Sequence, residues 1–558
     1  MVTRVLNLFY REIRGLHQAA YILALFALAS QVLAIVRDRI LAHQFGAGSE
    51  LDVYYAAFRI PDLLFVLFAS VLSVYVLLPF VTKAKTKSDE AAQAVLSQMF
   101  SLFLVGYTVI AGVTFIAAPF FASYIFPGFS VEAQTEAVLL LRILLLQPLL
   151  LGISSLLGVV TQMGHRFIIY ALSPLLYNIG IIIGAAILYP TFGIAGLAYG
   201  VVLGAFLHCL IQLPLVSTSD LRFNFTRSID FKTIRDIARV AIPRAVTLSL
   251  SQILLLVLVM MATTMTVGSV AVLQFAFNLQ SVPLAIIGMS YSVAAFPTLA
   301  SLLADKKQTE FNTYVLTALR HVIFWSTPVV VLVIVLRAQL VRVLLGSGSF
   351  DWADTRLTAA ALAIFVVSLL AQSILLLVVR AFYAGGFTRL PLIVTLVGTV
   401  FSGAFAYGLY TWFQFSPTAQ VFFTSLFRLE NVVGSEVLML PLGYALGVII
   451  EVILMLIFAG RTFGIQLRTL GKPFMVAIIA SLTGGLFAYA TLLFIVEGVN
   501  QETFVGILIQ GSVAGVFGLF GVILAYRLMG SPEMHEIYMA FKRKVIKSEI
   551  VTPQPDIL

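Results

Sequence analysis

The segment Asp52-Val53-Tyr54-Tyr55-Ala56-Ala57-Phe58-Arg59-Ile60-Pro61-Asp62 follows closely after Val36-Arg37-Asp38-Arg39. Together they place charged residues between two runs that are apolar enough to cross a bilayer. Ionisable side chains beside or within membrane spans are costly, so they usually have an interior partner, an aqueous cavity or a polar ligand. We therefore take this segment as the centre of both the fold and the function.

The composition indicates a membrane protein. The 558 residues are 61% hydrophobic and 11% charged, whereas roughly 25% of the residues of a soluble domain are charged. The mean hydropathy is +1.05. The net charge of +9 arises in short loops between apolar runs, which is a topology signal and argues against nucleic-acid binding. The single cysteine, Cys209, excludes an intramolecular disulfide and a thiolate metal cluster.

Apolar runs of about 20 residues, the length that crosses about 30 Å of hydrocarbon, predict an all-α polytopic membrane protein with about fourteen transmembrane helices. The predicted spans are 19–36, 53–80, 96–125, 138–161, 168–189, 193–216, 241–265, 270–300, 316–345, 358–382, 390–413, 436–459, 473–496 and 504–528.

Basic residues predict the orientation of these spans. An even number of spans places both termini on one side, and Lys and Arg are concentrated in the loops of that side. The opposite loops carry only Arg37, Arg39, Arg337, Arg342, Arg356 and Arg428. Because positive residues favour the cytoplasmic side, we expect both termini in the cytoplasm.

The chain also looks internally doubled. Ser73-Val74-Tyr75 and Pro79 in the second span correspond to Ser292-Val293-Ala294 and Pro297 in the eighth. The offset is six helices, so the halves should form two pseudo-symmetric six-helix lobes with the same membrane orientation. The predicted organisation is a cytoplasmic amphipathic N-terminus (1–18), an N-lobe (19–216), a cytoplasmic linker (217–240), a C-lobe (241–460), helices 13 and 14 (461–529) and a cytoplasmic tail (530–558).

No pattern of an enzyme site is present in the sequence. The six histidines lack metal-ligand spacing, and a nucleotide-binding loop of the Gly-x-x-x-x-Gly-Lys type is absent. We expect no catalytic residue, no metal and no cofactor. Transport driven by something other than ATP hydrolysis within this chain is the better expectation.

Ordered motifs between residues 19 and 460 suggest a family. The chain resembles the MurJ/MviN lipid II flippases of the multidrug/oligosaccharidyl-lipid/polysaccharide exporter superfamily. The motifs are Val32 to Asp38, Phe45-Gly46-Ala47-Gly48, Asp52, Ala57 to Pro61, Leu141-Arg142-Ile143, Arg166-Phe167, Asn178, Gly196 to Gly200, Gln212-Leu213-Pro214, Ser251-Gln252 and Phe382-Tyr383. The resemblance implies a V-shaped central cavity between two lobes, alternating access, a final helix pair that extends a groove for the polyprenyl tail, and a bacterial cytoplasmic membrane.

The resemblance also exposes departures at the substrate site. Family members carry cavity arginines that are thought to meet the lipid-linked pyrophosphate. Gln31, Phe65 with Val66, and Asn278 stand at the matching positions here, and Ser70 replaces an acidic residue. Arg37, Asp38, Asp52 and Arg59 are retained. The cavity candidates for substrate binding are therefore Arg37, Asp52, Arg59, Arg244, Asn278 and Gln31.

Each charged candidate also has a structural alternative. Arg37 with Asp38 could orient the end of the first helix, and Arg59 could form an ion pair with Asp62 or Asp52. Arg244 could replace a lost phosphate-binding arginine or snorkel at the interface.

The structural or coupling candidates are Asp38, Arg142 and Glu451. Arg142 could tie two helices together. Glu451, deep in the twelfth span, could couple transport to protons or donate a hydrogen bond to a neighbouring helix.

The leading hypothesis is a flippase that moves a lipid-linked peptidoglycan precursor, lipid II, by alternating access. Its partners would be that polyprenyl diphosphate and membrane lipids. One alternative is export of another lipid-linked polysaccharide unit or of a drug-like cation, which would need acidic cavity residues. Another is a non-transporting scaffold for cell-wall synthesis enzymes.

Overall fold

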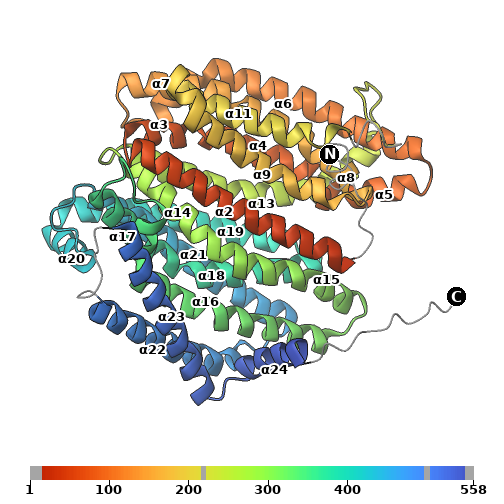
Figure 1. The fold of residues 1–558 in the computed structure, drawn as a ribbon. Coiled ribbons are helices and arrows are strands. Elements are labelled where there is room, and N and C mark those ends of the chain that lie inside the picture. The colour runs from red at the N-terminus through yellow and green to blue at the C-terminus, as the bar shows by residue number, and fades with distance from the viewer. Residues whose placement is uncertain (1–15, 215–220, 496–502, 547–558) are drawn as a thin grey trace. The chain divides into compact units, whose positions relative to one another are not determined.

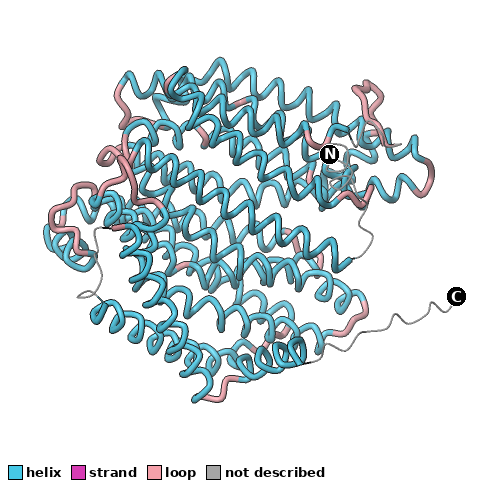
Figure 2. The backbone as a smooth tube through the Cα atoms, in the orientation of Figure 1, coloured by secondary structure: helices cyan, strands magenta, loops and turns pink. Residues whose placement is uncertain are grey.

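Helices make up the whole described fold. The computed structural model describes residues 16–214, 221–495 and 503–546, and these residues contain helices and loops but no strand (Figures 1 and 2). The α-helices are α2 (Leu16–Phe45), α3 (Ser49–Ala57), α4 (Arg59–Leu72), α5 (Val74–Lys85), α6 (Asp89–Ile125), α7 (Val131–Leu144), α8 (Leu146–Met163), α9 (Phe167–Ile183), α10 (Tyr189–Phe192), α11 (Ile194–Leu210), α13 (Phe231–Thr263), α14 (Ser269–Leu284), α15 (Ser290–Ala304), α16 (Gln308–Leu344), α17 (Trp352–Val367), α18 (Leu369–Ala384), α19 (Arg389–Phe415), α20 (Pro417–Phe427), α21 (Met439–Phe463), α22 (Gly471–Ile495), α23 (Phe504–Leu528) and α24 (Pro532–Ile546). Short π or 3-10 turns are η1 (Gly184–Leu188), η2 (Ala285–Met289), η3 (Ser435–Leu438) and η4 (Leu467–Leu470). The predicted all-α class is confirmed.

The membrane spans follow the predicted order. Among the described residues, eleven helical segments are long and apolar enough to cross a membrane, or twelve when the pair α17 and α18, bent by 41°, is one span. The two other predicted spans, 19–36 and 193–216, correspond to α2, with 30 residues, and to α11, with 17. The polytopic class is therefore confirmed, whereas the count of fourteen is approached but not reached by length and hydropathy.

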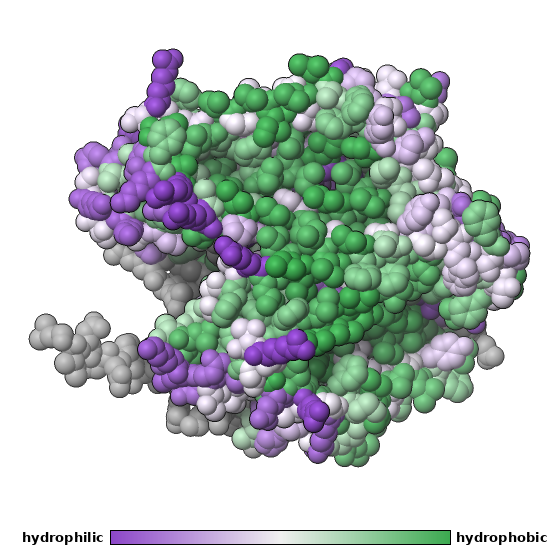
Figure 3. All heavy atoms as spheres, turned by 180° about the vertical axis from the view of Figure 1, so that it is seen from behind, coloured by the Kyte–Doolittle hydropathy of each residue, from purple (hydrophilic) through white to green (hydrophobic). Residues whose placement is uncertain are grey.

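Large apolar side chains lie on the surface of these helices. Ile116 of α6 is 78% exposed and Phe494 of α22 is 85% exposed. Hydrophobic residues cover much of the face drawn in Figure 3. Soluble proteins rarely expose apolar surface on this scale, whereas a lipid-facing surface requires it.

The described chain divides into two compact units. Unit 1 comprises residues 1–282, 341–365 and 386–451, and unit 2 comprises 283–340, 366–385 and 452–558. In unit 1, α13 packs against both α4 and α19. In unit 2, α22 packs along α23, and α15 packs against α18. The boundaries 19–216 and 241–460 of the expected lobes stay a prediction.

Prolines account for two of the helix breaks. A proline ring lacks an N–H and clashes with the carbonyl four residues earlier, which bends the preceding turn. Pro61 lies three residues after Phe58, where α3 gives way to α4, and Pro148 lies three residues after Leu145, where α7 gives way to α8. The charged segment that opened the sequence analysis is therefore interrupted at Phe58, between α3 and α4.

The expected linker 217–240 is partly helical, because α13 begins at Phe231. Asp230 caps this helix: its carboxylate accepts hydrogen bonds from the Lys232 N–H at 3.0 Å and from the Thr233 hydroxyl at 2.6 Å. These bonds lower the pKa of Asp230. The loop before it is fixed to α6, since the N–H of Thr226 donates to the Ser101 hydroxyl at 2.8 Å. Residues 217–220, like most of the expected N-terminal segment 1–18 and the end of the tail 530–558, lie outside the described residues.

Candidate functional site

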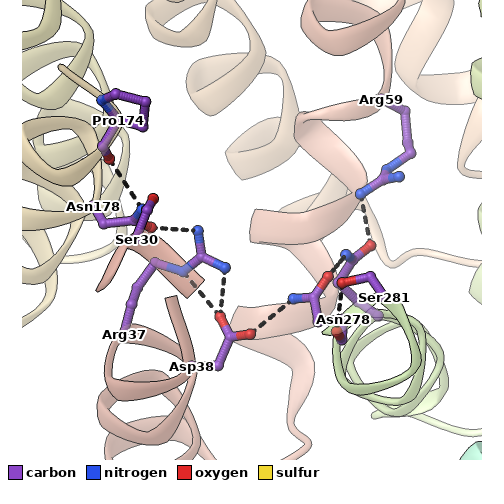
Figure 4. A network of polar contacts seen from close by, with 9 residues as sticks. Ser30, Arg37, Asp38, Arg59, Pro174, Asn178, Asn278 and Ser281 are labelled. Atoms are coloured by element: carbon purple, nitrogen blue, oxygen red, sulfur yellow. Dashed lines mark hydrogen bonds and ion pairs between the residues drawn. The ribbon is translucent and has the colours of Figure 1, made fainter. Parts of the chain in front are cut away.

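Arg37 lies near the end of α2, where its guanidinium is held from two sides. Its Nε and Nη2 donate to Asp38 Oδ1 at 2.9 and 2.7 Å, and its Nη1 donates to Asn178 Oδ1 of α9 at 3.1 Å (Figure 4). The amide of Asn178 in turn donates to the Pro174 carbonyl at 3.1 Å. The Arg37 side chain keeps 20% of its surface exposed, against 7% for Asp38. Arg37 is thus fixed in direction while part of its charge remains accessible.

A line of hydrogen bonds continues from Asp38 to the opposite helices (Figure 4). Asp38 Oδ2 accepts from the Asn278 amide of α14 at 3.0 Å. Asn278 Oδ1 accepts from the Gln274 amide at 2.6 Å, and Gln274 Oε1 accepts from Arg59 Nη2 at 2.8 Å. We call these residues, with Arg37, the Arg37–Arg59 network. The network joins α2 and α4 of the first half of the sequence to α14 of the second half. All five of its residues belong to unit 1.

The charge of this network is unbalanced. It contains two guanidinium groups and one carboxylate, connected by two neutral amides. Counted over the whole residue, Arg59 and Asp38 are each 5% exposed, so water screens these charges weakly. The hydrogen-bonded group itself therefore holds one more cation than anion, and Asp62 interacts electrostatically with its Arg59 from outside the group.

Arg59 does not form the expected ion pair with Asp52 or Asp62. Its Nε donates to the Tyr55 carbonyl at 3.2 Å, and its second bond is the one to Gln274. Asp62 accepts instead from the Gln147 amide at 3.5 Å. Asp52 is likewise engaged elsewhere, because it accepts from backbone N–H groups at the start of α14.

Asp52 holds the start of α14. Its Oδ2 accepts from the Gly268 N–H at 2.6 Å and its Oδ1 from the Ala271 N–H at 2.8 Å. A carboxylate is favourable here because the first N–H groups of a helix have no partner within it. Both oxygens of the Asp52 carboxylate thus accept a hydrogen bond, and the residue is 4% exposed. These bonds fix α3 to α14 and thereby position Asn278 further along α14.

The end of α2 is fastened to residues far along the chain. Arg39 donates to the Val343 carbonyl. The Ser349 N–H donates to the His43 carbonyl at 2.9 Å, and the Ala47 N–H donates to Asp354 Oδ2 at 3.0 Å. All of these residues belong to unit 1. The two halves of the sequence are thus linked by several short polar contacts beside the Arg37–Arg59 network.

Three other predicted residues are not among those drawn in Figure 4. Gln31 is half-buried on α2, and Arg244 is half-buried on α13. Arg142 of α7 donates to the Phe115 carbonyl of α6 at 3.1 Å, and its guanidinium lies 4.8 Å from the Phe115 ring. Arg142 therefore connects two helices.

Glu451 lies at the contact of α21 with α19. It is 7% exposed, and its carboxyl accepts a hydrogen bond from Thr395 of α19. Its Oε1 has no hydrogen-bond partner in the described structure. A Cβ atom built on Gly398 would lie 2.7 Å from Glu451 Cβ and from its Oε2. The glycine thus makes room for a carboxyl group between two membrane helices.

The sequence analysis missed Gln274 as a site residue and quoted Asn178 only as a motif residue. Gln274 and Asn278 are spaced i, i+4 on one face of a membrane helix, a spacing at which amide side chains interact. Polar amides repeated at that spacing in an apolar span were the available signal. In the part of the chain that the structure describes, no group of three or more His, Cys, Asp or Glu residues is arranged to hold a metal ion.

Comparison with known proteins agrees with this geometry. The family model described as "Lipid II flippase MurJ" matches residues 41–513. A curated relative from Buchnera aphidicola, a probable lipid II flippase MurJ, is 27% identical over 385 residues, which are 67% of this chain and 74% of the relative.

Solved structures show the same fold. A lipid II flippase MurJ in an inward closed conformation superposes with a TM-score of 0.72 at 21% identity, covering 91% of this chain and 99% of that one. An inward-facing multidrug resistance transporter of the MATE family superposes with a TM-score of 0.66 at 18% identity, covering 79% and 96%. The resemblance found in the sequence is confirmed, and the match over most of the chain shows that this protein belongs to the MurJ lipid II flippase family.

Proposed function

We propose that this protein moves lipid II, the lipid-linked peptidoglycan precursor, across a bacterial cytoplasmic membrane by alternating access. Its family is one of transporters and not of catalytic enzymes. The observation that carries the proposal is the excess positive charge of the Arg37–Arg59 network. A diphosphate needs fixed cationic donors in a low-dielectric site, and guanidinium offers them in a planar fork.

Within this network, Arg37 is the group that meets the diphosphate. Asp38 and Asn178 hold its guanidinium in place while 20% of the side chain stays exposed. Arg59 is more deeply buried and acts through Gln274 and Asn278 on the orientation of Asp38. Arg244 and Gln31 are secondary contacts for the head group, and Glu451 is a site for coupling or for helix packing.

Alternating access requires contacts that break and re-form. The bonds of Arg39, Ser349 and Ala47 join the end of α2 to the second half of the chain. These bonds would close the outer end of the path when both termini face the cytoplasm. The expected lobes, 19–216 and 241–460, would rock about them, and residues 461–529 would hold the polyprenyl tail.

A flippase-depletion strain tests the proposal. The wild-type gene should restore growth, and purified protein in liposomes should change the accessibility of lipid II. Arg37→Ala should abolish both effects, because a neutral side chain cannot bind the diphosphate. Arg356→Ala is the matched control: Arg356 forms only a partly exposed pair with Glu430 at 3.9 Å, and such pairs contribute little.

The alternatives give different results in the same strains. Export of a drug-like cation predicts that Arg37→Ala preserves or improves transport, since a positive site repels cations. Export of another lipid-linked glycan predicts activity in liposomes that hold that lipid and none with lipid II. A scaffold for wall-synthesis enzymes predicts that Arg37→Ala is silent. Each of these outcomes would overturn the lipid II assignment.

A further inference from the structure

A cavity of about 500 Å³ lies in unit 2 at the turn between α23 and α24. Its lining consists of Tyr526, Arg527, Gly530, Ser531, Pro532, Met534, His535 and Tyr538. None of these residues belongs to the Arg37–Arg59 network. Tyr526 and Arg527 stand at the end of the segment proposed to hold the polyprenyl tail, and the other six lie beyond it.

The walls of this cavity are fixed by the turn itself. Gly530 has a φ of +63°, which a residue without a Cβ adopts readily, and the Ser531 N–H donates to the Tyr526 carbonyl at 3.0 Å. The Tyr526 hydroxyl donates to the Phe324 carbonyl at 2.9 Å, and the two rings stack at 4.2 Å. The cavity is therefore built before any ligand arrives.

The charge of the cavity is positive. Arg527 is exposed within the lining, and His535 lies on the first turns of α24. Both nearby carboxylates already have partners: Glu533 accepts from the hydroxyl of the lining residue Ser531 at 2.7 Å, and Glu536 pairs with His321 of α16 at 3.1 Å. Neither carboxylate lines the cavity. An anion would thus meet a guanidinium without a competing acid in the lining.

The position of the cavity at the end of a membrane span favours an anion that belongs to a membrane lipid. The span α23 ends at Leu528, which is 78% exposed, so Arg527 lies where the helix leaves the hydrocarbon. Met534 and Ile537 pack α24 onto the core of unit 2, and Tyr538, one helical turn after Met534, is 56% exposed. The sequence continues with Lys542-Arg543-Lys544, a basic run typical of segments at an anionic membrane surface.

We propose that this cavity binds the phosphate of an anionic phospholipid from the leaflet around this end of α23. Arg527 donates to the phosphate oxygens, and the Tyr538 and Met534 side chains contact the glycerol and the first acyl carbons. The bound lipid anchors α24 against the membrane surface. This site is independent of lipid II, so the proposed transport function can fail while this proposal holds.

The test uses the full-length protein in an uncharged maltoside detergent. Calorimetric titration with dioctanoyl phosphatidylglycerol should show binding, and dioctanoyl phosphatidylcholine should bind more weakly. Arg527→Gln should weaken phosphatidylglycerol binding by about tenfold, the effect of about one charge-assisted hydrogen bond. Arg527→Lys should retain most of the affinity. The matched control is Arg468→Gln, which removes an exposed arginine of η4 outside the cavity and should leave binding unchanged.

Two results would overturn the proposal. Equal binding of phosphatidylglycerol by wild type and Arg527→Gln would remove the cavity as the site. Displacement of the lipid by inorganic phosphate at comparable concentration would show a site for a soluble anion and not for a membrane lipid. Thermal unfolding of each variant shows that it is folded, which the exposure of Arg527 leads us to expect.

Discussion

Asn278 of α14 donates its amide hydrogen to Asp38 of α2 over 3.0 Å, across 240 positions of the sequence. This bond, with the Gln274 bond on its other side, makes Asn278 the link between the two arginines. Asn278→Ala should leave Asp38 Oδ2 and the Gln274 amide without a partner. A buried polar group left unsatisfied costs about 1–3 kcal/mol. Chemical denaturation in detergent should show a loss of this order in the free energy of unfolding.

The control for this change is Asn431→Ala, because Asn431 is exposed and its loss should change stability by less than about 0.5 kcal/mol. Equal stability of the two variants would show that the bond between α2 and α14 contributes nothing. Asn278→Asp should be worse than Asn278→Ala, since it places a second carboxylate beside Asp38.

The contact of Gly398 with Glu451 predicts a large effect from one methyl group. Gly398→Ala would place its Cβ 2.7 Å from two Glu451 atoms, so α19 and α21 must move apart. Overpacking of this kind costs about 1–3 kcal/mol. The thermal midpoint of unfolding should fall clearly below that of the wild type.

Gly408→Ala, on the same helix, is the matched control for that substitution. A Cβ atom at Gly408 meets nothing within 4 Å, and alanine is favoured over glycine in a helix by about 0.5–1 kcal/mol. The midpoint of Gly408→Ala should therefore stay constant or rise. A similar fall for both variants would contradict the close contact of α19 with α21.

Removal of the Asp52 carboxylate should loosen the start of α14. Asp52→Ala leaves the N–H groups of Gly268 and Ala271 without their acceptors, and the loss of a helix cap costs about 0.5–2 kcal/mol. Hydrogen exchange at these two amides should speed up. Ser416→Ala removes the cap of α20, which bonds only three residues away, so its effect should stay within α20. Unchanged exchange at Gly268 in Asp52→Ala would contradict the capping role.

Asp230 supplies a pH prediction outside the membrane. Its folded pKa is lowered because Thr233 and the Lys232 N–H donate to the ionised carboxylate. The stabilisation is therefore present above the ordinary pKa of 3.8 and is lost as the pH falls through the lowered folded value. The protection factor of the Lys232 amide, which compares its exchange rate with the intrinsic rate at the same pH, should be constant near neutral pH and fall only in acid. Asp230→Ala should show low protection at every pH, and an unchanged protection factor would contradict the cap.

Hydropathy alone predicted the fold class and the order of the spans, because a bilayer imposes a minimum length of apolar helix on any sequence. It did not predict the breaks without a proline, such as the bend between α17 and α18 at Ser368. Those bends depend on tertiary packing. The end of the expected linker 217–240 was likewise not predicted, since α13 begins within it at Phe231.

The candidate site was predictable only in part. Arg37, Asp38, Asp52 and Arg59 stood out because charge is rare in apolar segments. Their partners could not be predicted in the same way. Gln274 is neutral and lies 215 positions from Arg59. A backbone N–H group such as that of Gly268 is common to almost every residue, so the sequence does not single it out. Charge therefore indicated where the site lies, whereas neutral acceptors, the amide oxygens of Asn178 and Gln274, decided how its arginines are held.

The Asp52 cap has a consequence for how the protein is made. Its acceptor atoms and the Gly268 N–H are separated by 216 positions, so the beginning of α14 cannot be capped until the second and eighth spans have both entered the membrane. Contacts of such long sequence separation form late. During synthesis, the ribosome thus delivers α3 long before the helix that it will cap, and assembly of unit 1 must wait for a segment from the second half of the chain.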